Sequence, residues 1–313
     1  MSGADRRLFC VGECMIEIAP ADEPGLARVG YAGDTFNTAW YARRLLPPAV
    51  SVDYVSAVGD DAQSDRMLAF MAAEGVGTGL VKRRPGMAPG LYMIALDGGE
   101  RSFSYWRASA AARTLSREPC LPADAGGGDA IHLSGITLAI LPADDRGRLL
   151  AEIGGARARG ALVAFDPNVR PRLWPDPDEM RTAISAAAAH ADIVLPSHDD
   201  ERAAFGDESP AATAARYGAL GAALVIVKDG AGDVLVASSE GARTLSVDPI
   251  ARPVDTTAAG DSFAAGVLAA RLAGEVDPLA GARLGAALAA RVVMGRGALV
   301  PFDAEAVRRE AGV

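Results

Sequence analysis

Short apolar runs of β type alternate with Ala-rich stretches whose apolar positions recur at helical spacing. The apolar runs lie at 52–58, 130–134, 162–166, 193–196, 224–228 and 234–237, and the helical stretches at 62–74, 144–159, 178–189, 261–273 and 278–293. This alternation predicts an α/β fold whose central, mostly parallel sheet is flanked by helices on both faces. In such sheets ligands bind beyond the carboxyl ends of the strands.

Two segments break this alternation. The β-rich runs 90–96 and 101–106 are joined by 97–100, which predicts a hairpin. The segment from Glu13 to Tyr31 lacks helical periodicity and is expected to supply further strands. We therefore expect a single α/β domain, 1–313, with a small β lid formed by roughly residues 13–34 and 88–109.

Charge and composition narrow the possible partners. The 313 residues carry a formal net charge of −9 without a basic block, so we expect neither nucleic acid nor a membrane surface as partner. The apolar run near the N-terminus is interrupted by Glu13 and Glu17, which argues against a signal peptide or a membrane span. An anionic ligand therefore requires a local positive site.

The three cysteines indicate neither a disulfide framework nor a zinc site. Cys10, Cys14 and Cys120 are odd in number and form no CxxC pair, which favours a reducing, cytoplasmic location. The even spacing of Cys10 and Cys14 predicts core positions on one face of a strand. The histidines also lack ligand spacing; they are His132, His190 and His198.

The stretch 255–263, Asp-Thr-Thr-Ala-Ala-Gly-Asp-Ser-Phe, carries the strongest chemical signal. Small residues lead directly into a helix, so free backbone N–H groups and the positive end of the helix dipole can meet an anion there. Asp261 at the edge of this site can accept a hydroxyl proton while the amides of Ala259, Gly260 and Asp261 hold a phosphoryl group. The alternative is that Asp261 only caps its own helix.

A second segment, 31–39, places small and polar residues at a turn before the amphipathic stretch 37–46. Together the two segments resemble the signatures of the ribokinase-type carbohydrate kinases, and the resemblance covers essentially the whole chain. It departs from the usual pattern at Ala32 and Ala258, where many members have Gly. Either Ala narrows the freedom of the backbone.

Within that family, five further blocks are similar to the 2-keto-3-deoxygluconate kinases. The blocks are 12–17, 89–92, 105–107, 133–141 and 166–174. This similarity implies a set of residues that contact the sugar acid, with Asp34 near its hydroxyls. The set comprises Gly33, Asn37, Tyr92, Tyr105, Arg107 and Arg170.

Charge chemistry favours the two arginines independently. A substrate carboxylate needs a fixed cation in an acidic protein, and Arg can bind it through two N–H groups. The alternatives are a solvated charge at Arg107 and a salt bridge from Arg170 to a carboxylate such as Asp166. Strand alternation places Tyr105 on the same face as Arg107, which favours substrate roles for both.

A glycine-rich turn, 228–233, follows the run 224–227 and can admit a nucleotide, although such a turn is also typical of a β-hairpin. No GxxxxGK[ST] loop occurs, which excludes a P-loop enzyme. The family resemblance implies ATP as phosphoryl donor. It implies nucleotide contacts from Asn168, Ser197, Lys228, Gly230 and Gly260, with Ala258 in the anion turn.

Mg²⁺ is expected to accompany ATP and bridge its phosphates. The family usually has Asn and, three residues later, Glu for this purpose, whereas this chain has Ser197 and Asp200. The carboxylates Asp199, Asp200 and Glu201 can equally complement a helix dipole. We therefore assign no protein ligand to the metal.

The sequence thus predicts transfer of the ATP γ-phosphoryl group to the terminal hydroxyl of 2-keto-3-deoxygluconate, with Asp261 as base. Two alternatives stay open: a kinase for a neutral ketose such as fructose or ribose, and a non-catalytic sugar-acid sensor. The strands of the expected lid also predict a homo-oligomer, because an apolar sheet edge needs covering.

Overall fold

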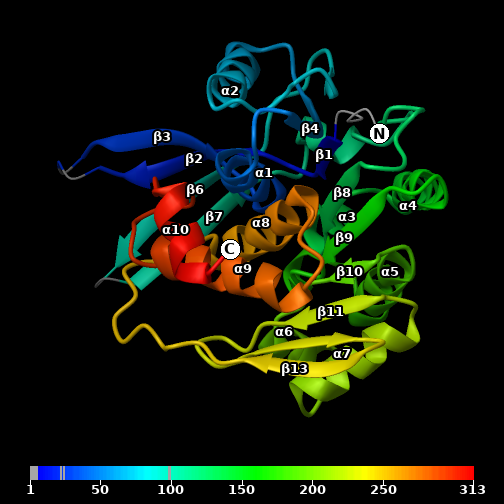
Figure 1. Cartoon of the computed structure of the whole chain (residues 1–313). Helices are drawn as coiled ribbons and strands as arrows, with labels where there is room; N and C mark the ends of the chain where they lie inside the picture. Colours follow the sequence, from blue (N-terminus) through cyan, green and yellow to red (C-terminus); the bar gives the residue numbers. More distant parts are fainter. Residues whose placement is uncertain (1–5, 22, 24, 98–99) are drawn as a thin grey trace.

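The computed structural model describes residues 6–21, 23, 25–97 and 100–313. Its larger sheet has nine strands in the order β13-β12-β11-β10-β9-β8-β1-β4-β5, in which β12 pairs antiparallel with both of its neighbours, β11 and β13 (Figure 1). These strands are β1 (Arg6–Val11), β4 (Val50–Val58), β5 (Val81–Arg83), β8 (Ala130–Ser134), β9 (Leu162–Asp166), β10 (Ile193–Val194), β11 (Leu224–Val227), β12 (Val234–Ser238) and β13 (Gly241–Leu245). The predicted, mostly parallel α/β sheet is confirmed.

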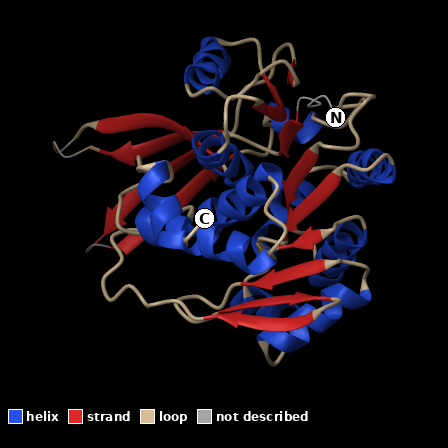
Figure 2. Ribbon diagram, viewed as in Figure 1, coloured by secondary structure: helices blue, strands red, loops and turns tan. Residues whose placement is uncertain are grey.

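Helices cover both faces of this sheet and create two separate cores (Figure 2). Successive residues of β1 show the division, because Leu8 and Cys10 join one core whereas Phe9 and Val11 join the other. The first core packs against α1 (Asp34–Leu45), α2 (Ala62–Ala73), α8 (Ala259–Ala273), α9 (Pro278–Val292) and α10 (Ala304–Ala311). The second packs against α3 (Gly135–Ile140), α4 (Ala143–Ala158), α5 (Pro177–Ala189), α6 (His198–Phe205) and α7 (Pro210–Ala219). The remaining helical turns are η1 (Ala111–Thr114) and η2 (Pro171–Leu173).

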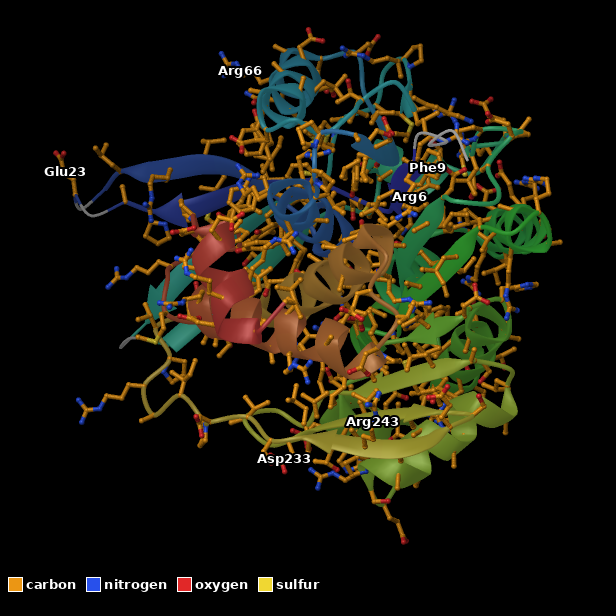
Figure 3. All side chains as sticks on the ribbon, viewed as in Figure 1. Arg6, Phe9, Glu23, Arg66, Asp233 and Arg243 are labelled. Carbon is orange, nitrogen blue, oxygen red and sulfur yellow. The ribbon has the colours of Figure 1, made fainter. Side chains whose placement is uncertain are left out.

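A second sheet of four strands forms the lid, in the order β3-β2-β6-β7. The strands are β2 (Met15–Pro20), β3 (Ala27–Ala32), β6 (Leu91–Asp97) and β7 (Glu100–Trp106). Both lid segments predicted from the sequence therefore contain strands, and residues 98 and 99 of the predicted hairpin turn lie outside the described residues. The β2–β3 hairpin extends away from the body, with the Glu23 side chain at its far end (Figure 3).

The prediction that Cys10 and Cys14 share one strand is wrong. β1 ends at Val11, and Gly12 to Cys14 carry the chain from the large sheet to the lid, where β2 begins. A single apolar run thus contains strands of two different sheets. The predicted burial is confirmed, because both side chains lie in the first core. In the described part of the chain, no helix is long and apolar enough to cross a membrane.

Candidate active site

Polar side chains gather where the strands of the large sheet reach their carboxyl ends. Asp166 ends β9 and accepts a hydrogen bond from Nζ of Lys228, which follows β11, at 2.9 Å. The backbone N–H of Asn168 donates to the other Asp166 oxygen at 3.0 Å. A Cβ atom added to Gly260 would lie 3.4 Å from the Lys228 ammonium. The start of α8 therefore faces a buried Lys–Asp pair at this edge.

The start of α8 is shaped by a turn that Asp255 closes. One of its carboxylate oxygens accepts the backbone N–H and the hydroxyl hydrogen of Thr257, and the other accepts the N–H of Gly297 at 2.6 Å. Ala258 then adopts a left-handed conformation with φ 61° and leads into the helix without a side-chain cap. The Ala259 amide, one of the three expected to hold a phosphoryl group, donates to the Thr256 carbonyl at 3.3 Å.

Asp261 is held from the side by α1. Nδ2 of Asn37 donates to the Asp261 carboxylate at 2.8 Å, and the Thr38 hydroxyl donates to the Asp261 carbonyl at 3.1 Å. The carboxylate is thus bound by another helix, which contradicts the alternative that it only caps α8. Burial and the negative charge of Asp34 raise the pKa of the Asp261 carboxyl to about 8, while the Asn37 hydrogen bond and Lys228 oppose that rise.

Position 33 requires Gly because another stretch of backbone passes close to it, and not because of its own backbone angles. A Cβ atom at this position would lie 2.0 Å from the carbonyl oxygen of Glu13. Its extended φ of 178° suits any residue. Its N–H donates to Oδ1 of Asn37 at 3.3 Å and so orients the amide that binds Asp261. Gly33 therefore connects the start of the lid to the predicted base.

Asp34 and Asn168 join the sugar side to the nucleotide side of the predicted site. Nδ2 of Asn168 donates to Oδ2 of Asp34 at 2.9 Å. Asp34 and Asp166 both raise the pKa of Asp261 by their negative charge, and Asn168 bridges these two carboxylates.

On the lid, two of the predicted substrate residues already have carboxylate partners. The Tyr92 hydroxyl donates to Glu17, and Arg107 forms an ion pair with Glu13. The side chain of Arg107 is 11% exposed, so the alternative of a solvated charge is wrong. Tyr105 is half exposed, and its ring centroid lies 5.9 Å from that of Tyr92.

Arg170 stands apart from these residues. Its Nη1 donates to the Val169 carbonyl at 2.7 Å and pairs with Asp200 at 3.3 Å, and its side chain is about half exposed. The alternative of a salt bridge is thus correct in kind but wrong in partner, because Asp166 binds Lys228 instead. These contacts do not bring Arg170 beside Arg107.

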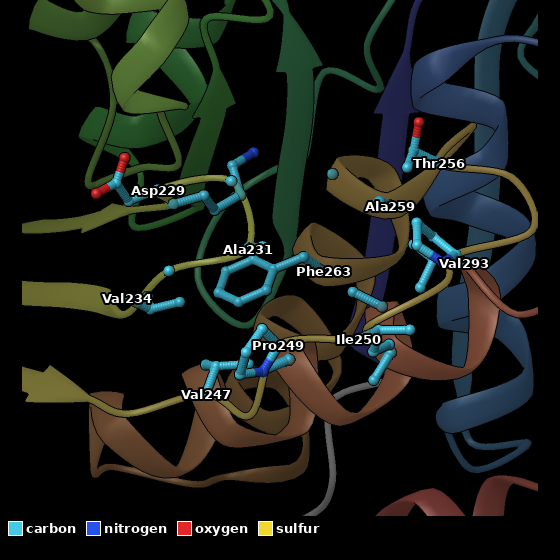
Figure 4. Close-up of a pocket in the computed structure, with 18 of the residues that line it drawn as sticks. Asp229, Ala231, Val234, Val247, Pro249, Ile250, Thr256, Ala259, Phe263 and Val293 are labelled. Carbon is cyan, nitrogen blue, oxygen red and sulfur yellow. The ribbon is translucent and has the colours of Figure 1, made fainter.

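A cavity of about 400 Å³ opens next to the start of α8 (Figure 4). Four of the predicted nucleotide residues line it: Ser197, Lys228, Gly230 and Gly260. Asn168 and Ala258 do not. The turn 228–233 also joins the antiparallel strands β11 and β12, so it is both a hairpin turn and a cavity wall.

Sequence reasoning missed the apolar wall of this cavity. Its members are Val247, Pro249, Ile250, Phe263, Ala286, Ala289, Ala290 and Val293. Ala286, Ala289 and Ala290 recur at one face of α9, and Val293 is its C-cap. This spacing is visible in the sequence but indistinguishable there from ordinary helix packing. Figure 4 shows the Phe263 ring projecting from α8 toward the β11–β12 turn. A flat, apolar ligand group fits such a wall.

The carboxylates after Ser197 have different environments. Glu201 is fully buried and accepts hydrogen bonds from Arg216 at 2.6 Å and Tyr217 at 2.9 Å, so it packs α6 against α7. Asp199 pairs with Arg202 at the surface. Burial raises the pKa of Asp200, and Arg170 opposes that rise. No group of three or more metal-ligating side chains occurs among the described residues.

The sequence profile of the pfkB family carbohydrate kinases matches residues 5–305 of the chain. The chain belongs to this family. It is 42% identical over 308 residues to the 2-dehydro-3-deoxygluconokinase of Dickeya dadantii (strain 3937), an alignment that covers 96% of this chain and 98% of that protein. It is 39% identical, with the same coverage, to the 2-dehydro-3-deoxygluconokinase of Escherichia coli (strain K12).

Solved structures agree with this family assignment. A pfkB protein from Polaromonas sp. JS666 superposes with a TM-score of 0.78 at 30% identity, covering 94% of this chain and 97% of that one. A putative ribokinase II from E. coli, in complex with ATP and Mg²⁺, superposes with a TM-score of 0.83 at 25% identity, covering 98% and 99%. The ribokinase-like fold expected from the sequence is confirmed.

Proposed function

We propose that this chain is a 2-dehydro-3-deoxygluconokinase. It transfers the γ-phosphoryl group of ATP to the terminal hydroxyl of 2-keto-3-deoxygluconate and yields the 6-phosphate and ADP. The observation that carries the proposal is the position of Asp261, held by Asn37 at the start of α8, beside the cavity that Lys228 and Gly260 line. Similarity to two enzymes of that name over nearly the full chain supports the choice of substrate.

Asp261 acts as the general base in this proposal. Its carboxylate takes the proton of the terminal hydroxyl, the hydroxyl oxygen attacks the γ-phosphorus, and the bond from that phosphorus to the β–γ bridging oxygen breaks. A pKa of about 8 keeps the base close to the operating pH, where proton acceptance is most effective. The Asn37 amide fixes which carboxylate oxygen faces the substrate.

The cavity beside α8 takes ATP. The apolar wall from Phe263 to Val293 suits the adenine ring, and the Lys228 ammonium beside Gly260 suits the phosphates. Asp166 neutralises Lys228 until the nucleotide arrives. Positioning of this kind supplies most of the catalysis in phosphoryl transfer.

Mg²⁺ would accompany ATP as its metal complex and would neutralise charge on the phosphates. The donor set fits this mode better than a dedicated protein site, because Asp166 is bound to Lys228 and Asp200 to Arg170. Asp200 stands where the family's metal motif has Glu, so it would be the protein carboxylate to hold the ion.

Arg107 is the cation for the substrate carboxylate. It directly follows β7 of the lid, and its side chain is buried as a recognition arginine should be. Arg170 is the second cation, and it must leave Asp200 or share it to reach the acid. A neutral ketose would leave both arginines without a substrate partner.

A substrate panel tests the proposal. Initial rates of ADP formation are measured with 2-keto-3-deoxygluconate, fructose and ribose for the wild type and for Arg107→Gln. We expect kcat/KM to be at least about 10-fold higher for the acid, and the Arg107→Gln variant to lose that preference. Equal kcat/KM for the neutral sugars would replace this proposal by a ketose kinase, and no ADP with any sugar would favour the sensor.

A further inference from the structure

The ion pair between Glu13 and Arg107 is unusually buried. Glu13 is 2% exposed and the Arg107 side chain 11%. One terminal nitrogen of Arg107 donates to Oε2 of Glu13. Removing two opposite charges from water costs several kcal/mol per ion unless all of their hydrogen-bonding atoms find partners. This pair does not meet that condition.

Two polar atoms of the pair make no hydrogen bond. Oε1 of Glu13 and Nε of Arg107 are buried and have no hydrogen-bond partner among the described residues. Unpartnered buried polar atoms are rare in folded proteins and each costs about 1–3 kcal/mol. Their chemistry is complementary, because the oxygen needs a donor and the N–H group needs an acceptor. The pair is therefore incomplete in a way that one ligand can complete.

The unpartnered oxygen lies on a defined face of the lid. A Cβ atom added to Gly90 would lie 2.6 Å from Oε1 of Glu13 and 3.3 Å from Cβ of Arg107. Gly90 precedes β6 next to Met15 of β2, whose side chain packs with Ala32 and Ala298 on the inner side of the lid. The Glu13 carboxylate thus occupies the space that a side chain of residue 90 would take.

The backbone of Glu13 is fixed as closely as its side chain. Its carbonyl oxygen lies where a side chain of Gly33 would stand, and the N–H of Gly33 binds Asn37, the partner of Asp261. Glu13 therefore lies within a short chain of contacts from both Arg107 and the proposed base.

We propose that Glu13 is a positioning and specificity residue: it holds Arg107 with Oε2 and accepts a substrate hydroxyl with Oε1. Arg107 Nε–H then donates to an oxygen of the acid. This inference rests on the proposed sugar-acid kinase function. The matching ligand is a hydroxy acid, which brings a donor and an acceptor together, whereas a simple carboxylate supplies only the acceptor.

The opposite charges of Glu13 and Arg107 support a role of the pair in substrate selection. A lone buried Arg would attract any anion, but Glu13 offsets part of its charge, so that binding of the acid depends on a matching pair of hydrogen bonds as well as on charge. Burial raises the pKa of Glu13, while Arg107 lowers it. The pair thus discriminates by hydrogen-bond pattern, which is the stronger basis for rejecting analogues.

The test is the variant Glu13→Gln, which keeps the shape of the side chain and removes its charge. KM and kcat are measured with ATP and each of 2-keto-3-deoxygluconate, fructose and ribose. For the substrate that the wild type prefers, we expect KM to rise by about 10-fold or more, with KM for ATP within about twofold of the wild type. An unchanged KM for that substrate would overturn the inference.

Asp129→Asn is the matched control. Asp129 is also a buried carboxylate paired with an arginine, Arg7, at 2.7 Å, but it precedes β8 and so lies at the end of the sheet opposite the site. The thermal stability of the Asp129→Asn variant should fall, while its KM for the sugar and its KM for ATP stay unchanged. A rise in the sugar KM of this control would show that loss of any buried pair produces the effect, and would overturn a specific role for Glu13.

Two further variants strengthen the test: one measures the coupling of Glu13 to Arg107, and the other replaces Glu13→Gln if that variant does not fold. A double-mutant cycle of Glu13→Gln and Arg107→Gln should be non-additive in kcat/KM, because the two residues act as one unit. If Glu13→Gln does not fold, Glu13→Asp carries the same test, since it withdraws the carboxylate by one methylene and should raise KM likewise. Wild-type preference for fructose or ribose would refute the proposed function, while the KM of the variants for that sugar would still decide the role of Glu13.

Discussion

The surroundings of the Asp261 carboxyl group act on its pKa in opposite directions. Burial and Asp34 favour its protonated form, whereas Asn37 and Lys228 favour the carboxylate. The result is a group whose pKa of about 8 places its proton exchange within reach of ordinary pH. A helix-capping Asp would have no reason for such an environment.

This environment predicts a pH dependence. The base must be unprotonated, so kcat/KM for the sugar should rise about 10-fold for each pH unit below 8 and level off above it. Rates at a series of pH values with saturating ATP and Mg²⁺ measure the profile. A profile that is flat between pH 6 and 9 would show that no group of raised pKa limits the free enzyme.

The two alanines at family glycine positions are predicted to behave in opposite ways. Ala258 has φ 61°, a conformation that costs an L-residue about 1–2 kcal/mol, so Ala258→Gly should leave thermal stability unchanged or slightly raised. Ala32 lies buried in β3 with ordinary backbone angles, so Ala32→Gly should lower stability by about 1 kcal/mol or more. Thermal unfolding of both variants measures this, and an equal loss in the two would contradict the assignment of strain to Ala258.

At the residue scale, the sequence could identify groups whose chemistry is local. The run of small residues before Asp261 announces an anion site because the signal lies within one turn. Glu13 escaped notice because its partner Arg107 is 94 residues away in the chain. The partner of Arg170 could not be chosen from the sequence either, since a choice between Asp166 and Asp200 depends on tertiary distances.

At the scale of elements, the start of α1 determines the position of Asp261, the proposed base. Gly33 lets the chain pass close to the Glu13 carbonyl, and the first turns of α1 then present Asn37 and Thr38 to α8. Helices α1 and α8 thus form one unit, in which a shift of α1 moves Asp261.

Gly33→Ala is therefore expected to damage both stability and activity. Its Cβ would lie 2.0 Å from a backbone oxygen, so we expect a loss of about 2 kcal/mol or more and a fall in kcat. Gly30→Ala, within β3 just before Gly33, places its Cβ 3.6 Å from the nearest atom and serves as the control. Chemical denaturation and steady-state rates measure both, and equal tolerance of the two variants would contradict a structural need for Gly33.

Elements were predictable where periodicity and turn residues agreed. β8 and β9 match their predicted bounds because each is an apolar run of strand length next to Gly or Pro, with Gly135 after β8 and Pro167 after β9. The run from Leu8 to Ile18 was misjudged, because residues buried in two different sheets form a continuous apolar pattern in the sequence. Nothing local in Gly12 to Cys14 reveals the change of sheet.

At the scale of the whole molecule, the site is formed by parts that are distant in the sequence. The lid supplies Arg107 and Tyr92, the strand ends supply Asp166 and Lys228, and α8 supplies Asp261. The apolar wall of the cavity beside α8 forms only when α9 packs beside the loop after β13. Sequence patterns therefore predicted the layers of the fold but not this wall. The homo-oligomer and the cytoplasmic location stay predictions.

The central claim is that both substrates meet at Asp261, which serves as the base. Replacement of Asp261 by Asn keeps the shape of the side chain and its contact with Asn37, but the Asn amide cannot accept the hydroxyl proton. Since the pKa of Asp261 is raised in the folded protein, its stabilising contribution is present at low pH and is lost as pH rises through about 8. Asp261→Asn should consequently be at least as stable as the wild type at pH 8.

The most direct measurement compares wild type and Asp261→Asn in two ways, by the rate of ADP formation with 2-keto-3-deoxygluconate and by calorimetric binding of ATP and of the sugar acid. The account predicts that kcat falls by about 100-fold or more while both dissociation constants stay within a few fold. Retention of wild-type kcat by Asp261→Asn, with both ligands bound, would contradict it.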